Sequence, residues 1–412
     1  MMGNWKTCTI GDLGTVVGGA TPSTKKAENY DGGTISWITP KDLAGFSGRF
    51  ISRGERNITE QGLKSCSTQL MPAHTVLFSS RAPIGYIAIA EQEVCTNQGF
   101  KSVVPNKDTD YMFLYYLLKY NKDKIENLGS GTTFKEVSGS TMRGIEVSVP
   151  DSIEEQRQIA SVLSALDDKI EKNMEVNENL QEQVKALFHA MFLSSEDRLS
   201  WENGTFSDLI ESTLGGDWGK ESPTGNNSEM VYCIRGADIP EVKAGNKGKM
   251  PTRYILPKNY AAKRLLPGDI VVEISGGSPT QSTGRVAAIS QSLLDRYDKG
   301  MVCTNFCRAI KPKSGYSMFV YYYWQYLYDR NVFFSYENGT TGIKNLDLSG
   351  FITTEEIVIP PFELIQKFDD YCQIVFDQTF ANGLENEQLS NLRDTLLPQL
   401  MSGELDISDI DL

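Results

Sequence analysis

The residues that could carry acid–base, nucleophilic or metal chemistry are few in this chain. Only two histidines are present, His74 and His189, and neither has a nucleophile or carboxylate at the spacing of a catalytic motif. Cys303 and Cys307 are close in sequence, but CxxC spacing is absent and a zinc site would need further thiolate or imidazole ligands. We therefore expect structural histidines, reduced and mostly buried thiols, and no catalytic or metal-binding residues.

Two other kinds of motif resemble, only in part, a phosphate-binding loop and a methyltransferase motif. Gly215-Gly216 and Gly276-Gly277 lack the strand, lysine and helix that accompany a phosphate-binding loop, so we interpret them as turns. The segment Ile359-Pro360-Pro361-Phe362 is similar to the Pro-Pro-aromatic core of an adenine methyltransferase motif, but Ile359 replaces the required Asp, Asn or Ser. We interpret this segment as a strand end followed by a helix N-terminus, where proline is tolerated.

Nucleic-acid binding is the chemistry for which candidate residues exist. The window 242–268 contains seven basic residues and no acidic one. Basic side chains neutralise phosphates, and arginine or polar side chains recognise base edges. The alternative for each patch is an ordinary solvated surface. Ranked by charge and position, the candidate DNA-binding residues are Lys25, Lys26, Arg49, Arg53, Arg56, Arg81, Lys135, Lys243, Lys247, Lys249, Arg253, Lys258, Arg285 and Lys344.

The net charge of −13 argues against nucleic acid only until it is sorted by segment. Residues 151–200 hold 11 acids and 5 bases, and residues 361–412 hold 11 acids and 2 bases. The rest of the chain is therefore close to neutral, and the acidity belongs to two segments that the sequence predicts to be helical.

The elements that must position these residues occur twice. Cys95-Thr96-Asn97 returns 208 residues later as Cys303-Thr304-Asn305, and Gly-Thr-Thr occurs at 131 and at 339. Each copy then runs through a short apolar strand into Pro150 or Pro360. A repeat of this length exceeds that of solenoid proteins, so it predicts two similar globular domains. Basic patches at equivalent places in two domains favour duplex DNA as the partner.

Each domain is followed by a long segment with helical periodicity. Residues 152–193 contain no proline or glycine, and their seam positions recur in steps of four and three, which is typical of a coiled coil. At 1.5 Å per residue this helix would be about 63 Å long. We expect Pro398 to kink or end the second helix. The predicted pairing residues are Leu166, Ile170, Asn173, Asn177, Leu180, Val184, Leu187, Leu389, Leu396 and Leu400.

These patterns predict an α+β fold with two similar mixed α/β domains separated by a pair of long antiparallel coiled-coil helices. The expected boundaries are 1–150 for the first domain, 151–195 for the central helix, 196–360 for the second domain and 361–412 for the C-terminal helix. Asparagines in the seam would select one register. The alternative is that each apolar stripe packs only on its own domain.

Location is predicted from what the chain lacks. No apolar run approaches 18 residues, and the N-terminal stretch has no apolar core typical of a signal peptide. We expect no membrane association and a cytoplasmic location.

Several motifs, in order and over essentially the whole length, resemble the specificity subunits of type I restriction-modification enzymes. They are Gly11-Asp12-Leu13, Gly18-Gly19-Ala20-Thr21-Pro22-Ser23, Trp37-Ile38-Thr39-Pro40-Lys41-Asp42-Leu43, the Gly-Thr-Thr segments at 131 and 339, Glu154-Glu155-Gln156-Arg157-Gln158-Ile159-Ala160, and Leu392-Arg393-Asp394-Thr395-Leu396-Leu397-Pro398-Gln399-Leu400-Met401-Ser402-Gly403-Glu404-Leu405. The second helix departs from this pattern at residues 362–366.

The resemblance implies a non-catalytic subunit. Two target-recognition domains would each bind one half of a split sequence in double-stranded DNA, and the helices would set the spacer between the halves. Two methyltransferase subunits would supply S-adenosylmethionine and adenine-N6 chemistry, and restriction subunits would use ATP and Mg²⁺. No cofactor is expected on this chain. The alternatives are a self-sufficient DNA methyltransferase with fused recognition domains and a coiled-coil adaptor that binds proteins.

Overall fold

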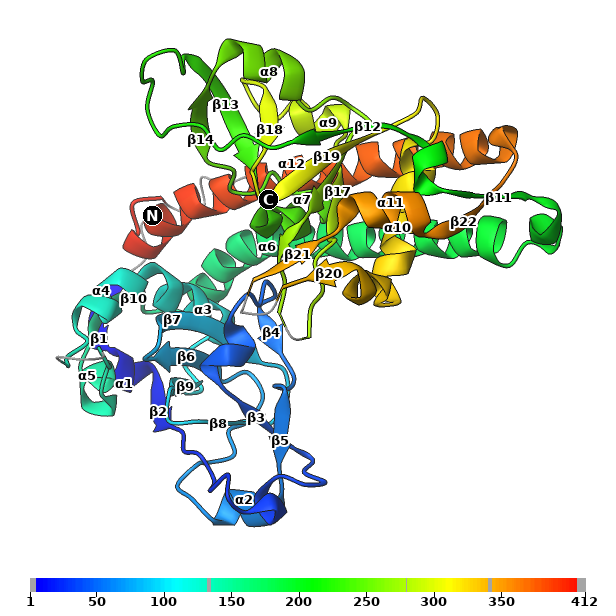
Figure 1. Ribbon diagram of the computed structural model, residues 1–412. Helices are drawn as coiled ribbons and strands as arrows, with labels where there is room; N and C mark the ends of the chain where they lie inside the picture. The colour runs from blue at the N-terminus through cyan, green and yellow to red at the C-terminus, as the bar shows by residue number, and fades with distance from the viewer. Residues whose placement is uncertain (1–4, 132–134, 279, 340–342, 406–412) are drawn as a thin grey trace. The chain divides into compact units, whose positions relative to one another are not determined.

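The chain folds into two structural units, and each contains one copy of the repeated domain (Figure 1). The structure is a computed structural model that describes residues 5–131, 135–278, 280–339 and 343–405. The first unit comprises Met1–Glu171 with Leu389–Leu412, and the second comprises Lys172–Gln388. The threonines of both Gly-Thr-Thr segments lie outside the described residues.

The first unit is built on a five-stranded sheet, with a three-stranded sheet and a two-stranded pair beside it. The five-stranded sheet has the order β2 (Gly14–Gly18), β9 (Lys101–Pro105), β6 (Val76–Ser80), β7 (Ile84–Ala90) and β4 (Phe50–Ile51). The smaller sheet has the order β5 (Arg56–Ile58), β3 (Ile35–Ile38) and β8 (Cys95–Thr96). The first and last strands of the domain, β1 (Trp5–Thr9) and β10 (Glu146–Pro150), pair antiparallel.

The second unit repeats this arrangement and adds a small sheet. Its main sheet has the order β12 (Ile210–Gly215), β19 (Cys307–Pro312), β15 (Ile270–Glu273) and β17 (Val286–Ala288). A three-stranded sheet has the order β14 (Thr252–Ile255), β13 (Glu229–Ile234) and β18 (Met301–Cys303). The closing pair is β11 (Glu202–Thr205) with β22 (Glu356–Ile359), and the additional sheet is β16 (Ser275–Gly276), β21 (Lys344–Leu346) and β20 (Glu337–Asn338).

Short helices connect these strands, and one apolar helix in each domain forms much of the core. In the first unit the helices are α1 (Ile10–Leu13), α2 (Glu60–Lys64), α3 (Tyr111–Tyr120), α4 (Lys122–Asn127) and α5 (Gly139–Arg143). In the second they are α7 (Ile239–Lys243), α8 (Pro257–Lys263), α9 (Gln291–Leu294), α10 (Ser317–Asp329) and α11 (Leu348–Thr354). Most side chains of α3 and α10 are buried, because each helix packs between its sheet and the long helices.

The predicted duplication is confirmed by topology. In both domains the middle strand of the smaller sheet pairs parallel with a strand that leads into the repeated turn, as β3 pairs with β8 and β13 with β18. The register differs by one residue from the sequence match. Ile38 pairs with Thr96 and Ile234 pairs with Cys303, so Thr96 is equivalent to Cys303 rather than to Thr304. The match between the two Cys-Thr-Asn triplets is therefore displaced by one position.

Repeated aspartates explain why the turns after these strands are alike. Asp42 accepts a hydrogen bond from the backbone N–H of Thr39 at 2.7 Å, and Asp238 accepts one from the backbone N–H of Arg235 at 3.0 Å. Each carboxylate satisfies an N–H group at the start of a single helical turn, which otherwise has no intrahelical partner. This shared geometry fixes how the chain leaves β3 and β13.

Two long helices complete the fold. α6 spans Ile153–Phe188 and ends in a π-helical turn at His189–Leu193, and α12 spans Phe362–Ser402. At 1.5 Å per residue, α6 is about 54 Å long and α12 about 62 Å. The helix continues through Pro398 to Ser402, so the expectation that this proline ends the helix is wrong, and the alternative of a kink at Pro398 stays a prediction. The α+β class with long antiparallel helices is confirmed.

Candidate functional site

Within the second unit, α6 and α12 are joined by asparagines. The Asn173 amide donates to Asn386 Oδ1 at 2.9 Å, and the Asn382 amide donates to Asn177 Oδ1 at 2.8 Å. Rising numbers on α6 meet falling numbers on α12, so the helices run antiparallel. The amide of Asn177 also donates to the Thr379 carbonyl at 3.1 Å. These buried amides satisfy each other in one register only, because a shift along either helix would leave them unpaired.

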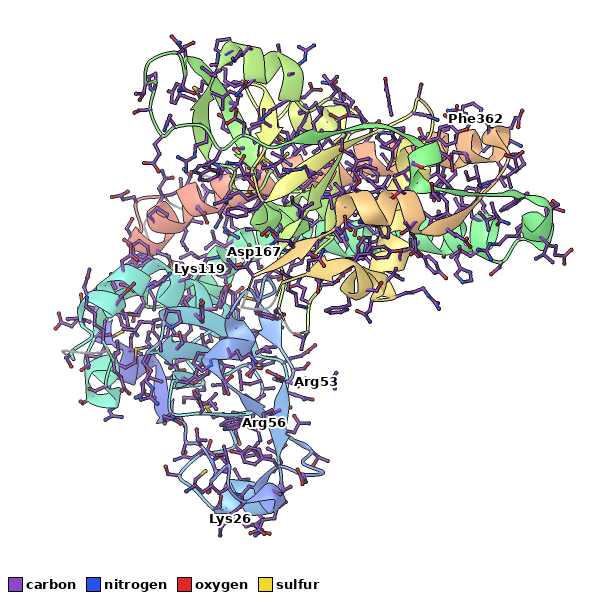
Figure 2. All side chains as sticks on the ribbon, in the orientation of Figure 1. Lys26, Arg53, Arg56, Lys119, Asp167 and Phe362 are labelled. Carbon is purple, nitrogen blue, oxygen red and sulfur yellow. The ribbon has the colours of Figure 1, made fainter. Side chains whose placement is uncertain are left out.

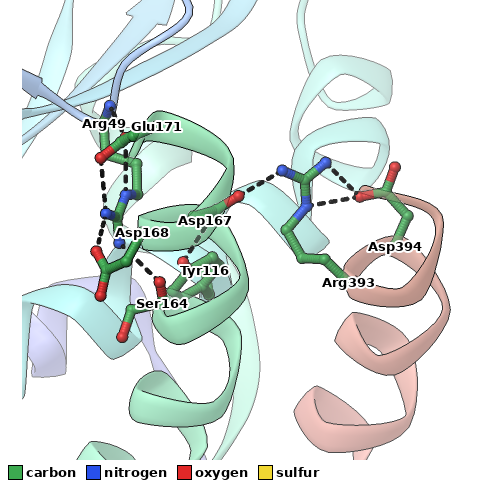
Figure 3. Close-up of polar contacts among 8 residues, drawn as sticks. All are labelled: Arg49, Tyr116, Ser164, Asp167, Asp168, Glu171, Arg393 and Asp394. Atoms are coloured by element: carbon green, nitrogen blue, oxygen red, sulfur yellow. Dashed lines mark hydrogen bonds and ion pairs between the residues drawn. The ribbon is translucent and has the colours of Figure 1, made fainter. Parts of the chain in front are cut away.

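Within the first unit, α6 and α12 are joined by an ion pair instead of asparagines. Asp167 on α6 is 5% exposed and binds Arg393 on α12, with Oδ1 2.5 Å from Nη1 (Figure 3). The hydroxyl of Tyr116 on α3 donates to the other oxygen of Asp167 at 2.7 Å. Arg393 also binds Asp394 through Nε and Nη2. Asp167 therefore connects three helices of this unit.

Arg49, a predicted DNA-binding residue, contacts the acidic turn of α6 that follows Asp167. It is 4% exposed, and its guanidinium pairs with Asp168 and with Glu171, at 2.8 Å from the latter's Oε2 (Figure 3). Its backbone N–H also donates to Glu171 at 3.1 Å. Because these carboxylates surround the guanidinium, Arg49 anchors β4 to α6 and is not free to contact a phosphate.

The remaining predicted pairing residues lie along the same helices. Val184 and Leu400 are buried, and Leu180 and Leu187 pack at the edge of the second unit's core. The segment of α12 around Leu400 packs with Leu163 of α6 in the core of the first unit. The partly buried positions are Leu166, Ile170, Leu180, Leu187, Leu389 and Leu396. The apolar stripes thus pack on their domains and face each other.

Exposed cations in the first domain gather around its smaller sheet. Lys25, Lys26, Arg53 and Arg56 are exposed, and Figure 2 labels three of them on this part of the domain. Arg56 lies over the ring of Tyr30, 4.0 Å from its centroid, which holds the guanidinium without neutralising it.

The other two candidates in the first domain are Arg81 and Lys135. Arg81 is half-buried and lies 3.6 Å from Glu136. Lys135 is exposed. Lys101 shares Glu136 at 3.3 Å, so this carboxylate is surrounded by positive charge.

In the second domain the predicted cluster separates into exposed and buried cations. Lys249 and Lys258 are exposed, and Lys247 is half-buried beside the ring of Tyr297. Arg253 is 8% exposed, lies 3.7 Å from the ring centroid of Trp218 and pairs with Glu221 at 3.2 Å. Its role is therefore partly structural.

Three further candidates have intramolecular partners. Arg285 pairs with Glu273 at 2.7 Å, and Lys344 pairs with Glu337 at 2.8 Å. Lys243 lies at the end of α7 and donates to Gln325 of α10. Burial lowers the pKa of Lys243 to about 8. This lysine lines a depression of about 400 Å³ between α6 and the domain.

The histidines and cysteines have structural surroundings. His74 stacks on Tyr111 with the ring centroids 4.2 Å apart, and His189 Nδ1 lies 3.0 Å from the Ser194 hydroxyl. Burial raises the pKa of the Cys303 thiol to about 12 and that of Cys307 to about 11. Among the described residues no group of three or more His, Cys, Asp or Glu side chains is arranged to hold a metal ion.

The glycine pairs are explained by close packing of backbone. A Cβ at Gly216 would lie 1.9 Å from the Thr304 carbonyl oxygen, and a Cβ at Gly19 would lie 2.1 Å from that of Thr96. These two glycines are equivalent, and each allows the strand from the main sheet to cross the end of the smaller sheet. Gly277 has a positive φ of 75°, as expected for a turn.

Sequence reasoning missed the residues at the tip of the turn between β18 and β19. Phe306 is 62% exposed and Asn305 is exposed, and both border a depression of about 460 Å³ with Trp218 and Arg235. The repeated Cys-Thr-Asn triplet pointed to this turn, but a ranking by charge passes over neutral side chains.

The fold and these contacts define a duplicated scaffold, in which two similar α/β domains are each followed by a long helix. No helix in the described part of the chain is long and apolar enough to cross a membrane. Residues 2–182 match the family model described as "Type I restriction modification DNA specificity domain".

Similar proteins place the whole chain in the same group. The type I restriction enzyme MjaIX specificity subunit of Methanocaldococcus jannaschii is 33% identical over 99% of this chain and 95% of its own length. The EcoR124I/EcoR124II specificity subunit of Escherichia coli is 29% identical over 40% of each chain. The crystal structure of a type I restriction-modification S subunit from M. genitalium shares the fold, with a TM-score of 0.56 and 17% identity over 97% of this chain and 96% of that chain. This chain belongs to the type I restriction enzyme specificity subunits.

Proposed function

We propose that this chain recognises a bipartite sequence in double-stranded DNA, with one half-site bound by each domain. The duplication carries the proposal, because two copies of one scaffold give two binding faces, and differing loops give them different sequence preferences. Exposed cations in both domains support it: Lys26 and Arg56 in the first, and Lys249 and Lys258 in the second.

The long helices would set the spacer between the half-sites. Support comes from the polar contacts that fix their register, namely Asp167 with Arg393 in one unit and Asn173 with Asn386 in the other. A helix pair that cannot slide holds its attached domains at a set separation. The acidic exposed faces of these helices favour protein partners over DNA.

The proposed partners are two methyltransferase subunits and restriction subunits, docked on this chain in the cytoplasm. S-adenosylmethionine, ATP and Mg²⁺ would be bound by those subunits, and this chain would carry no catalytic residue. The positions of the histidines and buried thiols are consistent with that division.

The spacer is tested by inserting one heptad between Glu171 and Lys172 and a matching heptad between Gln388 and Leu389. Each insertion falls between the polar contacts named above, so both sets of contacts are retained. A heptad adds about 10.5 Å to a helix, which is close to three base pairs of duplex at about 3.4 Å each.

The complex with its methyltransferase partners is assayed by mapping methylated adenines in genomic DNA. The expected result is a spacer longer by about three base pairs with both half-sites unchanged. A heptad inserted in α6 alone is the control, and it should impair folding because the Asp167–Arg393 ion pair and the asparagine contacts can no longer form together. An unchanged spacer in the doubly extended variant contradicts the ruler role. Binding of S-adenosylmethionine by the isolated chain would favour the fused methyltransferase instead.

The exposed cations are tested by charge reversal. Lys249→Glu with Lys258→Glu should weaken DNA binding and reduce the slope of log affinity against log salt by about one for each phosphate that is no longer neutralised. The control is Lys299→Glu, an exposed lysine outside the acid-free window. Unchanged affinity and slope would assign these lysines to a solvated surface.

A further inference from the structure

The turn between β18 and β19 holds its backbone fixed while it exposes two side chains. The Cys307 N–H donates to the Thr304 carbonyl at 3.0 Å, which closes a four-residue turn with Asn305 and Phe306 at its centre. The Thr304 N–H in turn donates to the Ile234 carbonyl at 3.0 Å. Both ends of the turn are therefore tied to the sheets.

Phe306 is exposed although its backbone is held. Its carbonyl accepts hydrogen bonds from the N–H groups of Ile274 at 2.9 Å and Ser275 at 3.3 Å, yet the residue is 62% exposed. The side chain of Asn305 is also exposed, and it makes no hydrogen bond to any of the described residues. A neutral amide and an aromatic ring are thus presented to solvent on a pre-organised turn.

Two cations, Arg235 and Lys263, lie near this turn. Arg235 borders the adjacent depression and is oriented by Asp238, which accepts from its Nε at 2.9 Å and from its Nη2 at 3.0 Å. Arg235 also donates to the carbonyl of Lys249 at 2.7 Å. On the other side, the Lys263 ammonium donates to the Gly216 carbonyl at 2.9 Å. Because Arg235 is paired with Asp238, only Lys263 of these two cations lacks a carboxylate partner among the described residues, and the tip of the turn carries no charge.

The first domain has an equivalent turn with a related residue at its tip. The Asn97 N–H donates to the Ile38 carbonyl at 3.0 Å, and the Phe100 N–H donates to the Asn97 carbonyl at 3.3 Å. This hydrogen-bond pattern makes Gln98 equivalent to Asn305. Gln98 is exposed, and its Oε1 accepts a hydrogen bond from the Thr21 hydroxyl. The position of Phe306 is occupied by Gly99.

We propose that these two turns are base-reading elements, and that their amide side chains each recognise an adenine in the major groove. Adenine presents an acceptor at N7 and a donor at N6, which Asn and Gln match bidentately, and its thymine partner presents a methyl group suited to an aromatic ring. Asn305 and Phe306 together specify one A·T pair in the second half-site. Gln98 specifies an adenine in the first half-site, without an aromatic contact to the thymine.

This assignment rests on the proposed function and names the residues that carry it out. The chemistry of the tip distinguishes base recognition from simple backbone binding, because phosphates are bound mainly by cations and hydrogen-bond donors. An exposed phenylalanine contributes nothing to phosphate binding. It does contribute to contact with a thymine methyl.

The test uses the complete complex with its methyltransferase partners and a DNA library in which both half-sites are randomised. Asn305→Ala should reduce discrimination at a single position of the second half-site by about 5- to 100-fold. Phe306→Ala should reduce discrimination at the same A·T pair. Gln98→Ala should do the same at a position of the first half-site only. Asn203→Ala, which removes an exposed amide from β11 of the same unit, is the control and should leave every position unchanged.

The other outcomes each overturn one part of the proposal. Unchanged preference at every position in the Asn305 and Phe306 variants refutes the turn assignment and leaves the bipartite reader intact. An equal loss of affinity for all sequences shows that the turn binds only the phosphate backbone of the DNA. Loss of methyltransferase subunits from the purified Phe306→Ala complex, with preference retained, assigns the ring to a protein interface. A wild-type complex that selects no sequence refutes the proposed function itself.

Discussion

Removing Asp167 tests whether the ion pair between α6 and α12 stabilises the first unit. Its side chain is 6% exposed and that of Arg393 is 16% exposed, so the pair is largely shielded from water. Breaking a buried pair by removing one partner costs about 3–5 kcal/mol, because the remaining charge stays buried. Arg393 keeps Asp394 as a partner at 2.8 Å, which places Asp167→Ala near the lower end of that range.

Removing the arginine should cost more. In Arg393→Ala the Asp167 carboxylate keeps only the Tyr116 hydroxyl as a donor among the described residues, so the loss should approach about 5 kcal/mol. The double variant removes both charges and should be less destabilised than the sum of the single variants. We expect a coupling energy of about 2 kcal/mol from the double-mutant cycle.

The assay is urea unfolding of the full chain followed by circular dichroism, together with amide hydrogen exchange of residues 389–402. Loss of the pair should shift the unfolding midpoint and increase exchange in this part of α12. The control is Lys172→Ala, which removes an exposed pair with Glu175 on α6 and should change stability by less than about 0.5 kcal/mol. A coupling energy below about 0.5 kcal/mol, or unchanged exchange in residues 389–402, would refute the reasoning.

Three further perturbations have expected outcomes. The pKa of Lys243 is lowered to about 8, so holding its charge in the folded state costs up to about 3 kcal/mol below that pH, and this cost fades as the pH rises towards 10.5. In urea unfolding, the gain in stability from Lys243→Met should therefore shrink between pH 7 and pH 10. A gain that stays constant would contradict this. Asn382→Ala should cost about 1–3 kcal/mol because it leaves the buried Oδ1 of Asn177 without its donor, and an unchanged unfolding midpoint would argue against a register-fixing role. Gly216→Ala should lower the melting temperature by several degrees because the added Cβ would collide with the Thr304 backbone. The control is Gly225→Ala, which has open space around it and should show only the smaller effect of its positive φ. Equal effects of the two substitutions would rule out the collision.

The sequence alone determined the duplication, the α+β class and the two long helices. Repeated anchors and the spacing of Asn173 and Asn177 are properties of the chain itself, and a helical stripe depends on neighbours only three or four residues away. The family resemblance followed from the same local motifs. Pro398 shows the limit of local rules, since α12 continues through it.

Only the tertiary structure decided which cations are free. Arg49 lies 122 residues from Glu171 in sequence, so nothing local indicates that this arginine is buried in an acidic turn of α6. Lys243 was equally indistinguishable from Lys249 until α10 supplied Gln325. The equivalence of Thr96 with Cys303 likewise came from strand pairing and not from matching letters. Burial and register depend on contacts between segments that are far apart in the sequence. The spacing of residues along the chain does not show which of these segments meet.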